Sequence, residues 1–132
     1  MPSKRILIVD DEAPIRQLLA EYLGELGYET AEACNGLDAL QKLKTVDPGL
    51  IILDLVMPEQ EGIETIAQLR RNKVTAKIIA ISGGGRSKNG DFLDLARRFG
   101  AYRTFRKPFD PDRLVEEIKA IGQVRETTQS IN

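Results

Sequence analysis

The sequence predicts an α/β protein in which five helices cover both faces of a doubly wound, five-stranded parallel sheet. Short apolar runs alternate along the chain with segments whose apolar residues recur at helical spacing, as in repeated strand–helix units. Three runs, at 5–9, 50–54 and 77–81, are apolar almost throughout, as expected of strands that helices cover on both faces. The two remaining strands are predicted at 29–33 and 101–106.

The first helix is predicted between the first two strands, where six apolar residues fall at i, i+3, i+4, i+7, i+8 and i+11 and form one continuous face. These residues are Ile15, Leu18, Leu19, Tyr22, Leu23 and Leu26. Pro14 suits a first helical turn, where its missing N–H has no partner, and Gly27 is typical of a helix end. We expect this face to lie in the core.

The four later helices are predicted from shorter apolar stripes, which we also expect in the core. The stripes are Leu37, Leu40 and Leu43; Ile63, Ile66 and Ala67; Phe92, Leu95, Ala96 and Phe99; and Leu114, Val115, Ile118 and Ile121. Asn35 is placed to cap the second helix, and Pro48 closes its connection to the third strand. Asp110 followed by Pro111 is a strong start signal for the fifth helix.

The second strand and the C-terminal segment differ from the rest of the chain. The strand at 29–33 is more polar than the others, so we expect it at an edge of the sheet. Residues 122–132 lack periodicity and are predicted to form a mobile tail, which leaves 4–121 as one domain. A chain of 132 residues is long enough to bury a core without disulfides or metals.

The composition excludes several classes of chemistry. The chain has no histidine, so Ser-His-Asp hydrolysis, Cys-His catalysis and His-ligated zinc are excluded. Cys34 is the single cysteine and is expected to be a small buried or half-buried residue. Nineteen basic against 20 acidic side chains give no electrostatic footprint for nucleic acid. The first apolar run is too short for a signal peptide or a membrane span, so we expect a cytoplasmic protein.

Charged residues stand at the ends of three predicted strands. Asp10 and Asp11 follow the first strand, Asp54 ends the third, and Lys107 follows the fifth. In a parallel sheet these ends share one edge, where open α/β sheets bind ligands. Three carboxylates and one ammonium at that edge predict a site for a hard divalent cation and a phosphoryl group.

Taken singly, these residues have simpler interpretations. Asp10 and Asp11 could merely cap the first helix, and Asp54 could cap a loop. Lys107 could be a solvated surface lysine, and Ser82 alone is uninformative. Their joint placement at strand ends favours a site over these alternatives.

Five fragments in the same order and at compatible spacing resemble the receiver domain of two-component response regulators, and the resemblance covers Lys4 to about Ile121. The fragments are Ile-Leu-Ile-Val-Asp-Asp-Glu at 6–12, Leu-Asp-Leu-Val-Met-Pro at 53–58 followed by Gly62, Ile-Ser-Gly at 81–83, Gly100-Ala101, and Lys-Pro-Phe at 107–109. The resemblance implies a flavodoxin-like sheet with strand order 2-1-3-4-5. It implies a phosphoryl-accepting signalling domain and not an enzyme acting on a separate substrate.

The resemblance also implies a role for each site residue. Asp54 would be the phospho-acceptor, and Mg²⁺ would be held by Asp10, Asp11, Asp54 and the main-chain carbonyl of Val56. Lys107 would pair with the phosphoryl oxygens. In the same comparison, the Ser82 hydroxyl would donate to one of those oxygens, and Pro108 would follow a cis peptide bond.

The implied partners are a histidine kinase or histidine phosphotransfer protein as donor, and a downstream protein that binds the face made by the fourth helix, fifth strand and fifth helix. No direct nucleic-acid or membrane contact is expected. Three features depart from the family pattern. The segment Gly83–Gly90 is glycine-rich and longer than usual, Thr104 replaces the usual switch aromatic, and no output domain follows, as would also be true of a piece of a larger regulator.

Two other classes of protein share parts of this pattern. A phosphatase of the haloacid-dehalogenase type also uses a strand-end aspartate with Mg²⁺, but it needs a carboxylate two residues later, where this chain has Val56. A flavodoxin-like binder would place a flavin phosphate after the first strand, where Asp10, Asp11 and Glu12 would repel it. Glycines 83–85 could cradle an anion but match no nucleotide fingerprint, and a flavin- or nucleotide-binding assay would discriminate.

Overall fold

The sheet has five parallel strands. The computed structural model describes residues 5–55, 59–82 and 92–131. The strands are β1 (Arg5–Val9), β2 (Glu29–Ala33), β3 (Leu50–Leu55), β4 (Lys77–Ser82) and β5 (Arg103–Arg106). Their order is β2-β1-β3-β4-β5, which confirms the predicted fold class and places β2 at an edge. Strand β5 begins at Arg103, two residues later than predicted.

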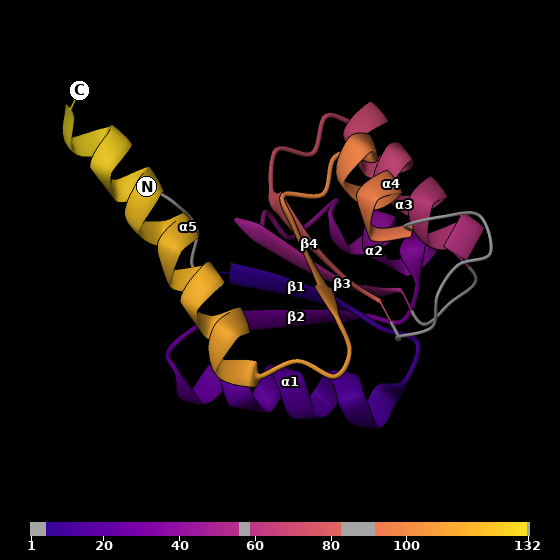
Figure 1. The fold of residues 1–132 in the computed structure, drawn as a ribbon, viewed down its shortest axis with the longest axis horizontal. Coiled ribbons are helices and arrows are strands. Elements are labelled where there is room, and N and C mark those ends of the chain that lie inside the picture. The colour runs from indigo at the N-terminus through magenta and orange to yellow at the C-terminus, as the bar shows by residue number, and fades with distance from the viewer. Residues whose placement is uncertain (1–4, 56–58, 83–91, 132) are drawn as a thin grey trace.

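The helices form a layer on each face of this sheet. They are α1 (Ala13–Glu25), α2 (Gly36–Lys42), α3 (Glu59–Arg71), α4 (Phe92–Phe99) and α5 (Pro111–Ile131). Helices α1 and α5 cover one face, and α2, α3 and α4 cover the other (Figure 1). Helices α1 to α4 each join two parallel strands, as the alternation of the sequence predicts, and α5 follows the last strand.

Local signals in the sequence set the helix ends. Gly27 adopts φ 98°, and the N–H of Tyr28 donates to the carbonyl of Leu23, which closes the end of α1. The Asn35 side chain accepts from the N–H of Asp38 at 2.8 Å, so the predicted cap of α2 is confirmed. Asp110 accepts from the N–H of Asp112 at 3.0 Å and begins α5 in the same way.

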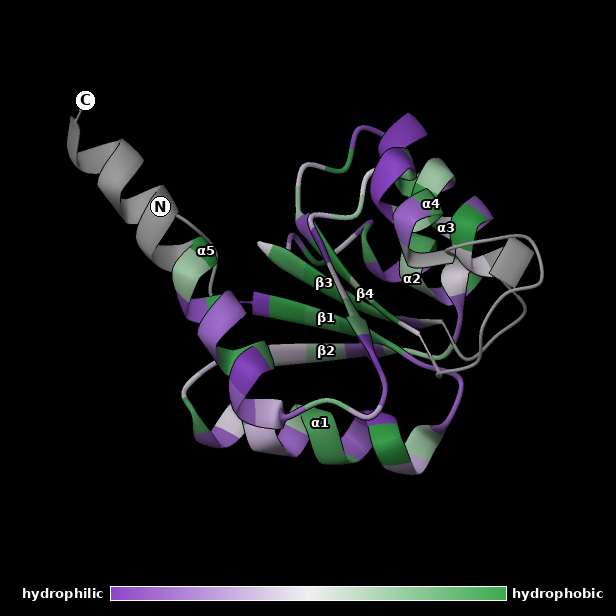
Figure 2. Cartoon of the chain, in the orientation of Figure 1, coloured by the Kyte–Doolittle hydropathy of each residue, from purple (hydrophilic) through white to green (hydrophobic). Residues whose placement is uncertain are grey.

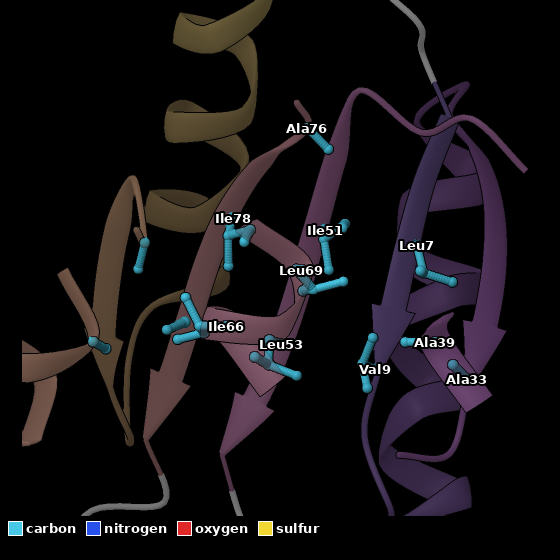
Figure 3. Packing of buried hydrophobic residues seen from close by; sticks show 13 residues of the cluster. Leu7, Val9, Ala33, Ala39, Ile51, Leu53, Ile66, Leu69, Ala76 and Ile78 are labelled. Atoms are coloured by element: carbon cyan, nitrogen blue, oxygen red, sulfur yellow. The ribbon is translucent and has the colours of Figure 1, made fainter. Parts of the chain in front are cut away.

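Two apolar clusters, one on each face, form the core. Alternate residues of β1 point to opposite faces, so that Leu7 packs toward α2 and α3 while Ile8 packs toward α1 and α5. Figure 3 shows the first cluster, with side chains of β1, β2, β3 and β4 against helix residues such as Ile66 and Leu69. The central strands are hydrophobic along most of their length (Figure 2). The whole predicted stripe of α5, from Leu114 to Ile121, is buried.

Other predicted core residues lie at the surface, so those predictions were wrong. The exposed ones are Ile15, Leu18, Leu26, Leu37, Leu95 and Phe99. In α1 the line that faces the sheet is Arg16, Ala20 and Leu23, at i, i+4 and i+7, so Leu18, which is 68% exposed, points away from the sheet. The six apolar residues cover a wide part of the surface of α1. A helix beside an edge strand buries only a narrower part of its surface against the sheet.

Two further expectations differ from the structure. Cys34 is exposed and not half-buried, because it follows the last residue of the edge strand β2. Helix α5 does not end at Ile121 but continues to Ile131, through the segment where an aperiodic tail was expected. The mobility of residues 122–132 stays a prediction. Among the described residues, no helix combines the length and the apolar character needed to cross a membrane.

Candidate functional site

The carboxyl ends of β1, β3, β4 and β5 bring the predicted site residues to one edge of the sheet. Asp54 is near the end of β3, between β1 and β4, and Lys107 comes directly after β5. The Nζ atom of Lys107 lies 2.6 Å from Oδ2 of Asp54. Lys107 is therefore not merely a solvated surface lysine, and the predicted convergence of these two residues is confirmed.

The Asp54 carboxylate is buried and only half satisfied. Its Oδ2 atom is paired with Lys107, whereas its Oδ1 atom is shielded from solvent and has no hydrogen-bond partner among the described residues. Leaving a buried carboxylate oxygen without a partner costs free energy. Such an atom marks a place where a ligand, a cation or a reacting group supplies the missing interaction.

Asp10 adds a second buried carboxyl beside Asp54. It is 2% exposed, and its Oδ1 atom accepts from the N–H of Glu12 at 2.9 Å. Burial is the largest cause that raises the pKa of Asp10 from 3.8 to about 6, and the negative charge of the neighbouring Asp54 contributes to the same rise. A cation bound between the two carboxylates would relieve this excess of negative charge.

The acidic residues after β1 do not act as an ordinary helix cap. The N-cap residue of α1 is Glu12, and its side chain makes no capping hydrogen bond. Oxygen atoms of Asp10, Asp11 and Glu12 lie within 4.8 Å of one another. This donor set of carboxylate oxygens, beside the orphaned Oδ1 of Asp54, fits a hard cation such as Mg²⁺. Glu12 was not among the predicted ligands, although it continues the acidic run.

Ser82 and Lys107 are joined through the main chain. Ser82 ends β4 and is half-buried, and its carbonyl accepts from the N–H of Lys107 at 3.0 Å. The Lys107–Pro108 peptide bond is cis, as the resemblance implied. Val56 and the Gly83–Gly90 segment lie outside the described residues, so the predicted carbonyl ligand and the glycine-rich loop stay predictions.

The structure places Phe105 on the opposite side of β5 from the usual switch aromatic. Phe105 packs in the cluster of α1 and α5, with its ring centroid 5.4 Å from that of Phe109. The pairing of β5 with β4 is continuous from Arg103 to Arg106, so no bulge shifts its register. The predicted orientation of Phe105 is confirmed, and Thr104 stands where the resemblance implied an aromatic ring.

Sequence reasoning missed one residue pair at this edge. Arg16 of α1 pairs with Glu32 of β2 at 3.0 Å and also donates to the main-chain carbonyl of Asp10 at 2.7 Å. The available signal was an arginine one helical turn before Ala20, on the line of α1 that faces the sheet.

Fold and site together define a class of protein: a doubly wound α/β domain with buried carboxylates and a lysine at the carboxyl edge of its sheet. The sequence matches the family model described as response regulator receiver domain over residues 6–119. The chain belongs to this family, the receiver domains of two-component systems.

Relatives of similar length support the same assignment. The chain is 37% identical over 122 residues to the chemotaxis protein CheY of Thermotoga maritima, covering 92% of this chain and 99% of that protein. It is 34% identical to the sporulation initiation phosphotransferase F of Bacillus subtilis, with 90% and 94% covered. Among solved structures, the response regulator TrrA of Thermotoga maritima in complex with Mg²⁺ and BeF is 39% identical, with a TM-score of 0.73 and 89% and 97% covered.

Family membership gives the coarse function. The chain is a phosphoacceptor signalling domain and not a classical enzyme, and receiver domains take phosphoryl groups from kinases or phosphotransfer proteins. Receiver domains generally depend on Mg²⁺. The assignment decides against both the haloacid-dehalogenase and the flavin-binding alternatives.

Proposed function

We propose that Asp54 accepts a phosphoryl group from a phosphohistidine of a histidine kinase or histidine phosphotransfer protein, and that this changes the binding of a downstream protein. The observation that carries the proposal is the unequal state of the Asp54 oxygens. Oδ2 is paired with Lys107 at 2.6 Å, and Oδ1 is buried without a partner among the described residues. The unpartnered oxygen is free to attack phosphorus.

The transfer step can be written for these residues. Oδ1 of Asp54 forms a bond to phosphorus while the P–N bond of the donor breaks, and the leaving imidazole nitrogen keeps the electron pair and takes a proton from solvent. The Lys107 ammonium then balances charge on the phosphoryl oxygens, and the Ser82 hydroxyl donates to one of them.

Asp10 and Asp11 would hold Mg²⁺ together with Asp54 and the main-chain carbonyl of Val56. The raised pKa of Asp10 supports this assignment, because it reflects a buried carboxylate that lies beside the second carboxylate of Asp54. When bound, the ion would neutralise charge on the transferring group. The carboxylates of this chain would determine where the positive charge of the ion lies.

In the direct test, the wild-type protein is incubated with phosphoramidate, a small phosphoryl donor that has a P–N bond like that of phosphohistidine. With Mg²⁺ we expect intact-mass spectrometry to show one added phosphoryl group, and with excess EDTA we expect almost none, because charge repulsion then opposes attack. Equal labelling in Mg²⁺ and EDTA would remove the metal from the proposal. No labelling in either condition would remove the phosphoacceptor role from this site.

Downstream binding is proposed at the face made by α4, β5 and α5. Exposed Leu95 and Phe99 on α4 support the proposal, and an ion pair of 3.3 Å between Arg103 of β5 and Glu117 of α5 joins the other two elements. Apolar side chains rimmed by charges are typical of protein-binding surfaces.

The cytoplasmic location and the lack of nucleic-acid and membrane contacts stay predictions.

Signal transmission should differ from that of receivers with a switch aromatic. Thr104 is too small to fill space released near Ser82, and Phe105 is held against Phe109 on the other side of β5. We expect Ser82 to draw residues 83–90 toward the phosphoryl group, with α4 following, since glycines permit large backbone changes at little steric cost.

Hydrogen exchange with and without beryllofluoride tests this transmission. Protection should rise chiefly across residues 83–95, because contacts with the phosphoryl mimic would restrain the loop and the start of α4. A change confined to 102–106, with 83–95 unaltered, would contradict the loop mechanism and return the role to β5.

A further inference from the structure

A network of hydrogen bonds ties Asp10 to the edge strand β2. The N–H of Asp10 donates to the carbonyl of Ala33 at 3.1 Å. On its other side, the carbonyl of Asp10 accepts from Nη1 of Arg16 at 2.7 Å, and Nε of Arg16 donates to Glu32 at 3.0 Å. The N–H of Asp10 is therefore held by Ala33 of β2, and its carbonyl is held by Arg16, which is itself paired with Glu32 of β2.

The geometry suits an arginine and no other cation. A guanidinium presents several N–H donors in one rigid plane, so Arg16 contacts Asp10 and Glu32 at once and holds them at a fixed separation. The Arg16 side chain is only 14% exposed, so water does not easily replace these bonds. A lysine ammonium at the end of a flexible stem would not impose the same plane.

The guanidinium of Arg16 forms its ion pair with Glu32 and not with the carboxylate of Asp10. The carboxylate of Glu32 pairs with this guanidinium directly, at 3.0 Å. The hydrogen bond from Arg16 to Asp10 ends on the main-chain carbonyl and not on the carboxylate. Arg16 therefore acts on Asp10 through main-chain geometry, and it leaves the negative charge of the acidic site available to a metal ion.

We propose that the Arg16–Glu32 pair is a positioning device that fixes Asp10 for Mg²⁺, an inference that rests on the proposed metal site. Mg²⁺ requires a nearly ideal octahedron, whereas Ca²⁺ accepts irregular geometry. Groups that orient metal ligands commonly change metal affinity by ten- to a hundredfold. The edge strand β2, which supplies no ligand, thus contributes to ion selectivity through Glu32 and Ala33.

The test is calorimetric titration of metal-free protein with Mg²⁺ and, separately, with Ca²⁺. In Arg16→Ala, Mg²⁺ affinity should fall about tenfold while Ca²⁺ affinity changes by a few-fold at most. Glu32→Ala should weaken Mg²⁺ binding in the same direction, and Glu32→Gln should restore it, because an amide oxygen still accepts from Nε of Arg16. Loss of stability alone would not change the ratio of Mg²⁺ to Ca²⁺ affinity.

The chain offers a matched control at the other end of the same two strands. Arg5 of β1 pairs with Glu29 of β2 at 3.0 Å, far from the site, so Arg5→Ala should leave Mg²⁺ affinity unchanged. If Arg16→Ala fails to fold, the two Glu32 variants decide. Unchanged Mg²⁺ affinity, or equal weakening for both ions, overturns the positioning role while the metal site stands. A wild-type chain that does not bind Mg²⁺ overturns both proposals.

Discussion

Asp54→Asn is expected to abolish phosphoryl uptake from acetyl phosphate in Mg²⁺ buffer. An amide has no anionic oxygen to attack phosphorus, so the acyl phosphate cannot form. The substitution is nearly isosteric, and Lys107, whose side chain is 28% exposed, can take up water when its charged partner is lost. The fold should therefore persist while labelling, measured by intact mass, falls to background.

The matched control for this variant is Asp47→Asn, which changes the same side-chain type at an exposed position before β3. It should be labelled as fully as the wild type. Fragment spectra of the labelled wild-type protein should place the phosphoryl group on Asp54. Undiminished labelling of Asp54→Asn, or a label on another aspartate, would remove Asp54 from the acceptor role.

The sequence predicts the sheet well because helices cover both faces of the central strands, and such strands consist of consecutive apolar residues. Ile51 and Ile52 are each fully buried although they point to opposite faces of β3, so an unbroken apolar run was the right signal. The edge position of β2 followed equally from its polar residues. Convergence of Asp54 and Lys107 then follows from the parallel arrangement alone.

Helix faces were predicted less well, because spacing does not say which part of a broad stripe meets the sheet. In α1, the buried line includes Arg16, a residue that patterning assigns to solvent, while Leu18 is exposed. Tertiary partners decide this: Glu32 and the carbonyl of Asp10 satisfy the guanidinium, and they lie on a different strand and in a different loop. No local pattern contains that information.

Asp10→Asn is expected to stabilise the metal-free protein at neutral pH while it weakens Mg²⁺ binding. Burial raises the folded-state pKa of Asp10 from 3.8 to about 6, so between these pH values the folded state binds more protons than the unfolded state. Stability from this group is thus fully present below about pH 4 and lost as pH rises through about 6. The ionised carboxylate costs at most about 3 kcal/mol above that range. The amide removes this cost and can donate to the orphaned Oδ1 of Asp54.

Thermal unfolding in EDTA, followed by circular dichroism across pH, measures this effect. At about pH 7.5 the melting temperature of Asp10→Asn should exceed that of the wild type by on the order of 5 °C, and the difference should vanish near pH 4. Added Mg²⁺ should raise the wild-type melting temperature and leave that of the variant almost unchanged. Asp11→Asn is the matched control: Asp11 is exposed, so this variant should lose the response to Mg²⁺ without gaining stability in EDTA. An Asp10→Asn protein that melts at or below the wild-type temperature at neutral pH would show that the buried carboxylate of Asp10 is not destabilising.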